Sequence, residues 1–315
     1  MSWFLFGGLL LLLLALDLGV FHKQATVPKP KESLLWTLVW VTIAISFSGF
    51  IYWSYASGFD QNTNQLTPGL AVAKYLTAYL LELSLSMDNV FVIAIILQYF
   101  KIPSAYQHRV LFWGILGAVV FRGLMIWLGV ALIHTFEWVN YLFGLILLFS
   151  AYKMFNTKHE HEKLKENSVI RMIRRFFPVT KGLHGNHFAI KRGRIWALTP
   201  LFLALFTIEL TDVMFAIDSV PAALSITTDP YLVYTSNIFA ILGLRSMYFV
   251  LAILLSKFRY LQPMLVFILV FVGIKMILSL HFHLPEWLSL GVVLGSLTLG
   301  ILLSLNATQK DKMNE

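Results

Sequence analysis

Two stretches of this sequence place acidic side chains inside long apolar segments. The first, Glu82–Val90, reads ELSLSMDNV, and the second, Glu209–Val220, reads ELTDVMFAIDSV. An ionised carboxylate at the centre of a bilayer costs about 2.5–3.5 kcal/mol on insertion scales, so an acid at that depth needs a partner or a cation. We therefore expect the function of the chain to be located in these two stretches.

The composition is that of a membrane protein. Hydrophobic residues make up 58% of the chain and charged residues 13%, whereas a soluble domain is about half apolar and about a quarter charged. The chain contains no cysteine, which excludes disulfides and thiolate metal sites. The net charge of +8 does not indicate nucleic-acid binding, because the basic residues gather in alternate loops.

Apolar segments of helical length predict an all-α, polytopic membrane protein with about nine transmembrane helices, since about 20 apolar residues cross a bilayer. The expected spans are 3–20, 34–55, 70–99, 109–130, 138–155, 197–226, 232–255, 263–281 and 287–306. Loops on one side of the membrane carry 20 of the 24 Lys and Arg residues, and the opposite loops carry none. The positive-inside rule then predicts an N-terminus outside and a C-terminus inside.

The acidic stretches begin a longer internal repeat. Aligning Asp88 on Asp218 also pairs Glu82 with Asp212. Two basic positions follow in the same order in each copy and pair as Arg122 with Arg245 and Lys153 with Lys275. Each copy contains three spans, an odd number, so the two copies are expected to be inverted. Inverted repeats are a transporter architecture with the substrate site near the midplane.

The repeat divides the chain into five expected segments. They are two N-terminal transmembrane helices in 1–69, the first repeat in 70–155, a basic cytoplasmic loop in 156–196, the second repeat in 197–283, and a last transmembrane helix with a short cytoplasmic tail in 284–315.

At membrane depth the acidic residues outnumber the basic ones. The acids are Glu82, Asp88, Glu209, Asp212 and Asp218, and their expected charge partners are Arg122, Arg245 and Lys275. The excess negative charge predicts a bound cation, or protons that neutralise some of the carboxylates. The arginines would hold the acids when the ion is absent, although they could instead bind an oxyanion substrate.

The available ligands favour a hard cation. Carboxylates, the Asn89 amide and the Ser219 hydroxyl are oxygen donors, which suit magnesium, calcium and manganese. A thioether from Met87 or Met214 would favour manganese, although either side chain could equally face lipid or fill a packing gap.

Helix geometry constrains how these acids can meet. Residues six apart on an unbroken helix point about 120° away from each other. Glu82 and Asp88 would then not face one site, and neither would Asp212 and Asp218. We therefore expect both acidic spans to be tilted or broken near the motif, with Pro221 as the breaking residue in the second.

These motifs resemble the TerC family of integral membrane proteins, and within it the Alx-type branch. The resemblance rests on Glu82–Val90, Glu209–Pro221 and Ser236–Arg245 and extends over almost the whole chain. It implies a manganese exporter of the bacterial cytoplasmic membrane, with family links to tellurium resistance and the alkaline-pH response. One departure is Leu83, where family members often have Lys. The resemblance places the family's metal-site acids on Glu82, Asp88, Glu209, Asp212 and Asp218, with Asn89 and Ser219 as neighbours.

We therefore expect a transporter that exports manganese(II) through a midplane acidic site, with Asp88 and Asp218 as central ligands and a proton as the candidate counter-ion. The expected partners are the manganese ion and the lipid bilayer. Neither a resident cofactor nor a nucleic acid is expected. The alternatives are a calcium or other divalent-cation exchanger and a membrane component of tellurium or oxyanion resistance. A membrane enzyme is less favoured, because no nucleophile lies beside a base and the acidic spans contain no histidine.

Overall fold

The computed structural model describes residues 1–19, 30–59, 62, 65–156, 178–180, 182–192, 195–254, 260–279 and 284–314. The described side chains do not include those of Met87, Asp88 or Arg245.

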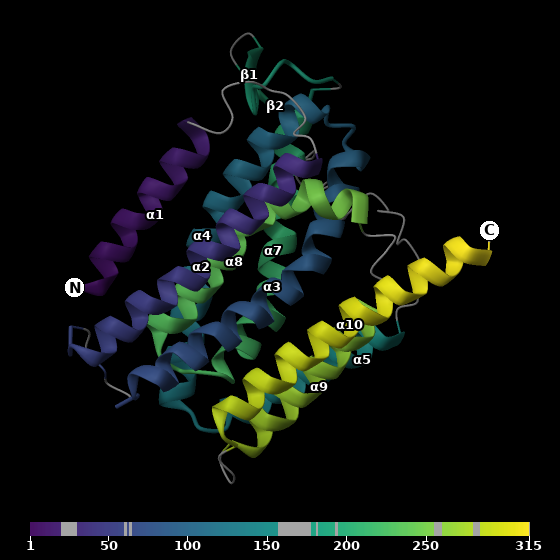
Figure 1. Ribbon diagram of the computed structural model, residues 1–315. Helices are drawn as coiled ribbons and strands as arrows, with labels where there is room; N and C mark the ends of the chain where they lie inside the picture. Colours follow the sequence, from purple (N-terminus) through teal and green to yellow (C-terminus); the bar gives the residue numbers. More distant parts are fainter. Residues whose placement is uncertain are drawn as a thin grey trace.

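Within these residues the chain forms nine α-helices and one β-hairpin (Figure 1). The helices are α1 (Ser2–Gly19), α2 (Pro30–Ala56), α3 (Pro68–Tyr99), α4 (Ser104–Thr135), α5 (Val139–Asn156), α7 (Pro200–Leu224), α8 (Pro230–Leu254), α9 (Leu261–Leu278) and α10 (Glu286–Asn314). The strands are β1 (Ala189–Arg192) and β2 (Ile195–Leu198). Each expected span falls on one of these helices.

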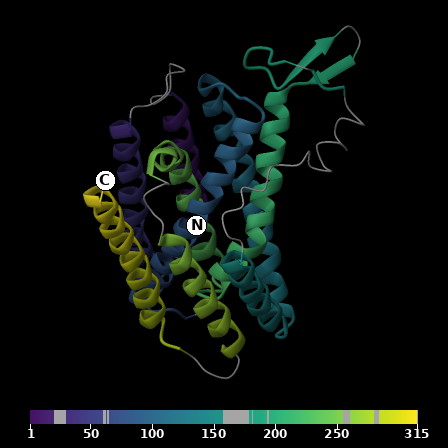
Figure 2. The same ribbon diagram turned by 90° about the vertical axis from the view of Figure 1, so that its right-hand side faces the viewer.

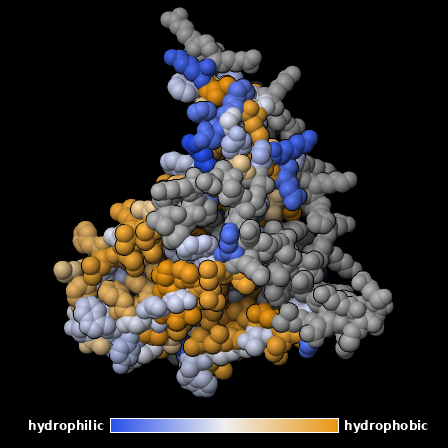
Figure 3. Space-filling view, turned by 45° about the horizontal axis from the view of Figure 1, so that its top comes forward, coloured by the Kyte–Doolittle hydropathy of each residue, from blue (hydrophilic) through white to orange (hydrophobic). Residues whose placement is uncertain are grey.

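The described surface of the helices is largely apolar, as expected for a protein in lipid. Four helical segments are long and apolar enough to cross a membrane: Glu32–Ala56, Ala105–Thr135, Pro200–Leu224 and Glu286–Ser304. Large hydrophobic side chains such as Val120, Trp127 and Phe149 are exposed, and Figure 3 shows broad hydrophobic areas with hydrophilic residues gathered at one end. A soluble monomer rarely exposes such large apolar patches. Crossing by the remaining helices stays a prediction.

Proline sets the start of α3, α7 and α8, each of which has proline as its first residue. A proline fits there because its missing N–H would have no partner within the helix. The residue before it caps the helix in two cases. Thr67 accepts a hydrogen bond from the N–H three residues on at 3.4 Å, and Asp229 Oδ1 accepts one from the N–H of Tyr231 at 3.0 Å. Asp229 Oδ2 also accepts from the Tyr55 hydroxyl at 2.8 Å, which ties α2 to the start of α8.

The helices of the two predicted repeats interleave. Helix α3 packs mainly on α8, α4 on α7, and α5 on α9. Helix α2 lies against α3 and α8, and α10 lies against α9 and α3 (Figures 1 and 2). The acidic helices α3 and α7 also contact each other. The two stretches that the sequence singles out therefore lie in one core.

The β-hairpin departs from the all-α prediction. Strands β1 and β2 are antiparallel, with Ala189 opposite Leu198 and Arg192 opposite Ile195, and Figure 2 shows the hairpin projecting beyond the end of α7. It lies at the end of the segment expected to be a basic loop. The sequence carries the signal, because two short runs containing β-branched or aromatic residues flank a glycine. Residues 157–177 of the loop lie outside the described part of the chain.

Neither acidic helix is interrupted, so the break expected at Pro221 is not present. Helix α3 is continuous, and α7 continues to Leu224 with Pro221 inside it. Because Pro221 lies in the last turn, the hydrogen bond that it cannot donate is lost near the helix end, where few further bonds depend on it.

Helices α5 and α9 approach closely through two glycines. A Cβ added to Gly144 would lie 2.9 Å from the carbonyl oxygen of Gly273 and 2.5 Å from the side chain of Ile277. A Cβ added to Gly273 would lie 3.1 Å from the carbonyl oxygen of Gly144. Small residues let helix backbones approach in this way.

We predict that Gly144→Ala destabilises the protein by about 1–3 kcal/mol, because the new methyl group overpacks this crossing. The control is Gly291→Ala in α10, where a Cβ would meet no atom within 4 Å. Alanine is the better helix former, so the control is neutral or stabilising. The measurement is the thermal unfolding midpoint in detergent, and equal midpoints for the two variants would contradict the close crossing.

Candidate functional site: a buried arginine between the two acidic helices

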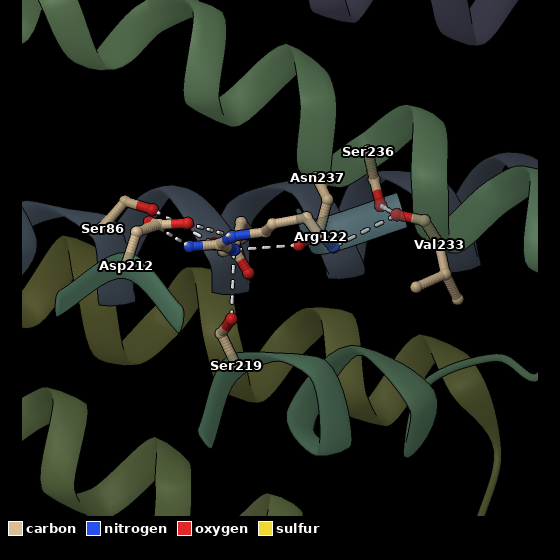
Figure 4. Close-up of polar contacts among 8 residues, drawn as sticks. Ser86, Arg122, Asp212, Ser219, Val233, Ser236 and Asn237 are labelled. Carbon is tan, nitrogen blue, oxygen red and sulfur yellow. Dashed lines mark hydrogen bonds and ion pairs between the residues drawn. The ribbon is translucent and has the colours of Figure 1, made fainter. Parts of the chain in front are cut away.

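Arg122, near the middle of α4, is a buried guanidinium that gathers side chains from three other helices (Figure 4). Its side chain is 0% exposed. Nη1 forms an ion pair with Glu82 Oε1 of α3. Nη2 and Nε donate to the two carboxylate oxygens of Asp212 of α7 at 3.2 and 3.4 Å. Glu82 and Asp212 are the residues that the repeat alignment equates, so Arg122 joins the same position of both copies.

Neutral oxygens complete the surroundings of this guanidinium. Ser219 Oγ and Asn237 Oδ1 each accept a hydrogen bond from Arg122 Nη1 at 3.0 Å. Ser86 Oγ donates to Glu82 Oε1 at 3.2 Å. Charged groups in such an enclosed place need several well-oriented partners to offset their desolvation, and Arg122 has partners on α3, α7 and α8.

The helical period determines which acids of α7 face Arg122. On α7, Glu209, Asp212 and Ser219 are three and seven residues apart and share one face, because the helix repeats every 3.6 residues. Asp218 lies off that face and accepts a hydrogen bond from Ser150 of α5 at 2.6 Å. The continuous helix therefore separates Asp212 from Asp218, as the 120° argument requires when no break is present.

Glu209 occupies space that a glycine leaves free. A Cβ on Gly117 of α4 would collide with the Glu209 carboxyl group. Glu209 also lies close enough to Asp212 to interact with it electrostatically. The carboxyl group thus fits between α4 and α7 because Gly117 has no side chain.

The cluster is acidic on balance. Glu82 Oε2 and Glu209 Oε2 are buried and have no hydrogen-bond partner among the described residues. If Glu82, Glu209 and Asp212 are all ionised, the single guanidinium leaves two negative charges unbalanced. Isolated buried charges are expensive, so the arrangement can take up protons or one divalent cation.

A complete metal site is not seen among the residues that the structure describes, where no three or more His, Asp or Glu side chains are placed to hold an ion. Asn89 is buried in α3. Met214 is 59% exposed on the outside of α7 and offers no thioether to the cluster. The pairing of Asp88 with Asp218 stays a prediction, because the Asp88 side chain lies outside the description. Glu82, Asp212 and Ser219, all expected to be near the ion, contact Arg122, and their binding of an ion stays a prediction.

Lys275 differs from its expected role as a partner of the membrane acids. Its Nζ donates to Glu286 Oε2 at 2.8 Å and to Ser289 Oγ at 2.9 Å. Lys74 Nζ lies 3.4 Å from Glu286 Oε1. Because Glu286 begins α10, this group of charges fastens α10 to α9 and α3. The Arg245 side chain is not described, so its expected partnership stays a prediction.

A cavity is lined in part by Asp212. It has a volume of about 40 Å³, enough for about three or four water molecules at roughly 10–15 Å³ each. Asp212 and Tyr248 are its two lining residues with polar side-chain atoms. The lining residues are Val90, Ile93, Leu111, Gly114, Ile115, Ala118, Ile208, Asp212, Ile241, Leu244 and Tyr248.

The sequence analysis did not single out Asn237, Ser150 or Tyr248. A polar side chain within an apolar span was the available signal. That signal is weak for serine and tyrosine, which are common in membrane helices and at their interfaces. It is stronger for Asn237, whose neighbours Ile238 and Phe239 are apolar.

The apolar helices and the buried ionic cluster define an integral membrane protein with ionisable groups in its core. The family model described as "Integral membrane protein TerC family" matches residues 68–312. The chain therefore belongs to the TerC family.

Relatives match over nearly their whole lengths. An uncharacterized membrane protein of Myxococcus xanthus is 44% identical over 304 residues, which cover 96% of this chain and 91% of the relative. A membrane protein of Rickettsia bellii is 42% identical, with 97% of each chain covered. The Escherichia coli K12 protein described as "Putative membrane-bound redox modulator Alx" is 40% identical, covering 96% of this chain and 93% of its own. No solved structure matches the chain.

We predict that Arg122→Met lowers the stability of the folded protein by about 3–5 kcal/mol, because it leaves buried carboxylates without their cation. Adding Glu82→Gln and Asp212→Asn recovers part of the loss. The measurement is the thermal midpoint and the monodisperse fraction in detergent. Arg109→Met, which removes a partly exposed arginine from the same helix, is the control. A midpoint unchanged by Arg122→Met would contradict the structural role of this ion pair.

We predict that Gly117→Ala also destabilises the protein, by about 1–3 kcal/mol, because its methyl group displaces the Glu209 carboxyl group. Combining it with Glu209→Ala recovers most of that loss, since the space is then shared. The matched control is Gly114→Ala, whose Cβ would meet its nearest neighbour, the Ile208 side chain, at 3.5 Å. Equal thermal midpoints for Gly114→Ala and Gly117→Ala would contradict the placement of Glu209.

Proposed function

We propose that the protein exports manganese(II) from the cytoplasm through the acidic cluster around Arg122. The observation that carries the proposal is that Arg122 forms ion pairs with one acid from each predicted repeat. One guanidinium binds Glu82 and Asp212, and when these two acids and Glu209 are all ionised, two negative charges remain that Arg122 does not balance. Two charges match one divalent cation, and intramembrane acids of this kind mark ion pathways.

The packing of the helices supports an inverted repeat. The first helix of each predicted copy packs on the second helix of the other, as α3 on α8 and α7 on α4, and the two third helices, α5 and α9, pack on each other. A two-fold axis in the membrane plane would relate these pairs. Transporters built in this way hold their substrate near the midplane, between the repeats.

Arg122 acts as the internal counter-charge of the empty transporter. A cation that binds the free oxygen of Glu82 competes with the guanidinium for that carboxylate, and Glu209 Oε2 offers a further free oxygen. Release of Arg122 would then leave the shared carboxylates as oxygen ligands for manganese. Asp88 and Asp218 remain the proposed central ligands, with Asp218 released from Ser150 in the loaded state.

Export needs a driving force. The inside-negative potential opposes outward movement of a divalent cation by about 4.6 kcal/mol at 100 mV. Inward movement of protons on the same carboxylates is the simplest source of that energy. The gathering of basic residues in alternate loops supports an N-terminus outside and a C-terminus inside a bacterial cytoplasmic membrane.

The alternatives have less support. The described ligands are oxygens, which also suit calcium, so a calcium exchanger is the closest rival. Arg122 is fully engaged by the protein's own acids, which disfavours an oxyanion substrate at this place. The E. coli relative is described as a redox modulator. A redox role that uses thiols is excluded for this chain, because it has no cysteine.

We predict that wild-type protein lowers the manganese content of manganese-challenged cells that lack other exporters, and that Asp88→Asn with Asp218→Asn does not. Glu82→Gln with Glu209→Gln is expected to fail as well. The measurement is elemental analysis of washed cells, with manganese, calcium, magnesium and tellurium quantified together. Glu137→Gln, which changes an exposed acid in the turn between α4 and α5, is the control and keeps wild-type activity.

Equal manganese content in all cells, with each protein confirmed in the membrane, would overturn the proposal. A fall in calcium alone would favour the exchanger. In proteoliposomes, manganese flux without any response to a pH gradient would refute the proton coupling.

A further inference from the structure

The cavity below Asp212 lies in one half of the bundle. Apart from Ile241 and Asp212, which lie near the middles of α8 and α7, its lining residues come from the second halves of α3 and α8 and from the first halves of α4 and α7. All four of these half-helices point to the same membrane face, the one that the positive-inside rule assigns to the cytoplasm. Asp212 forms the deep end of the cavity and also holds Arg122. The cavity therefore extends from the ionic cluster toward the inner face.

A hydrogen bond lies on the inner side of this cavity. The hydroxyl of Tyr248, a lining residue near the end of α8, donates to Gln107 Oε1 in the first turn of α4 at 3.2 Å. Gln107 is itself held, because its Nε2 donates to the carbonyl oxygen of Ile102 at 3.0 Å. The contact thus joins the inner ends of α4 and α8 at a residue that lines the cavity.

We propose that this cavity is the inner access route of the transporter, that its occupant is a partly dehydrated divalent cation, and that Tyr248 and Gln107 form the door. The nature of the cargo rests on the proposed function, whereas the existence and side of the route do not.

The walls of the route explain how it can stay closed. Apart from Asp212 and Tyr248, the lining carries no polar side chain. Small apolar cavities stay dry, and apolar constrictions block ions by excluding water. The volume of about 40 Å³ holds about three or four waters at most, too few for a fully hydrated ion. Separation of α4 from α8 at the door would widen and wet the route, and the carboxylate at its end would then attract the cation.

The test uses single cysteines, because the chain has none of its own. Ala118→Cys places a thiol on the cavity wall. Val120→Cys, two residues on in the same helix, is the matched control, because Val120 is 66% exposed on the outer surface. A charged, membrane-impermeant methanethiosulfonate is applied to inside-out and to right-side-out vesicles. Such reagents attack the thiolate, which forms in water and not in lipid.

The cavity cysteine is expected to react from the inside-out face at least about tenfold faster than the control and than the same cysteine from the other face. Leu111→Cys, another lining position on α4, serves as a second variant if Ala118→Cys does not fold. Excess manganese slows both reactions if it occupies the route.

The door is tested in the same background. Tyr248→Phe removes the hydroxyl and keeps the ring, so the labelling rate should rise by about two- to tenfold, the effect of losing one neutral hydrogen bond. Tyr234→Phe, which removes a hydroxyl near the other end of α8, is the control and leaves the rate unchanged.

Lack of reaction at both cavity cysteines from the inner face, or reaction only from the outer face, overturns the route. A rate that Tyr248→Phe does not change overturns the door. Labelling requires no transport, so failure of manganese export with intact inner labelling removes the manganese proposal alone.

Discussion

A single guanidinium, placed where no water reaches it, is the constraint on which the rest of the core depends. Arg122 is tolerable in that position only while Glu82, Asp212, Ser219 and Asn237 surround it, because an uncompensated buried charge costs several kcal/mol. Those four residues come from three helices. The electrostatic requirement therefore fixes the relative rotation and depth of α3, α4, α7 and α8, and apolar packing fills the space that this arrangement leaves.

Continuity of α3 and α7 determines how the acids are distributed. An unbroken helix turns residues six positions apart to different sides, so α7 presents Asp212 to Arg122 and Asp218 to Ser150. The acidic motif is consequently divided between two environments: an ion-paired one between α4 and α7, and one against α5. Movement of an ion between the two environments would then require the helices to move, because no local kink in α7 brings the carboxylates together.

The sequence predicted the helices, the apolar class and the acidic positions, because these depend on local hydrophobicity and on the cost of charge in lipid. It also predicted correctly that Arg122 pairs with the acids. The sequence misplaced Lys275, whose partner Glu286 begins the last helix. The repeat alignment assumes that equivalent positions have equivalent surroundings. Helix α10, which carries Glu286, has no counterpart in the first copy. Asn237 and Tyr248 act through contacts across helices, and one sequence does not encode which faces of two helices meet. The hairpin at 189–198 has a local sequence signal, but this signal lies directly before the apolar segment of α7, and the expected span 197–226 overlaps it.

The helices of each predicted copy pack mainly on helices of the other copy, which limits how the copies can move. Helices α3 and α4 descend from one predicted copy, yet the main packing partner of α3 is α8 and that of α4 is α7. Neither copy can therefore swing as a block, because such a swing would tear apart the largest helix contacts in the molecule. The units that can move are therefore pairs that combine one helix from each copy, such as α3 with α8 and α4 with α7. Arg122, on α4, contacts Glu82 on α3 and Asn237 on α8. It therefore lies at the interface along which the α4–α7 pair can slide past the α3–α8 pair.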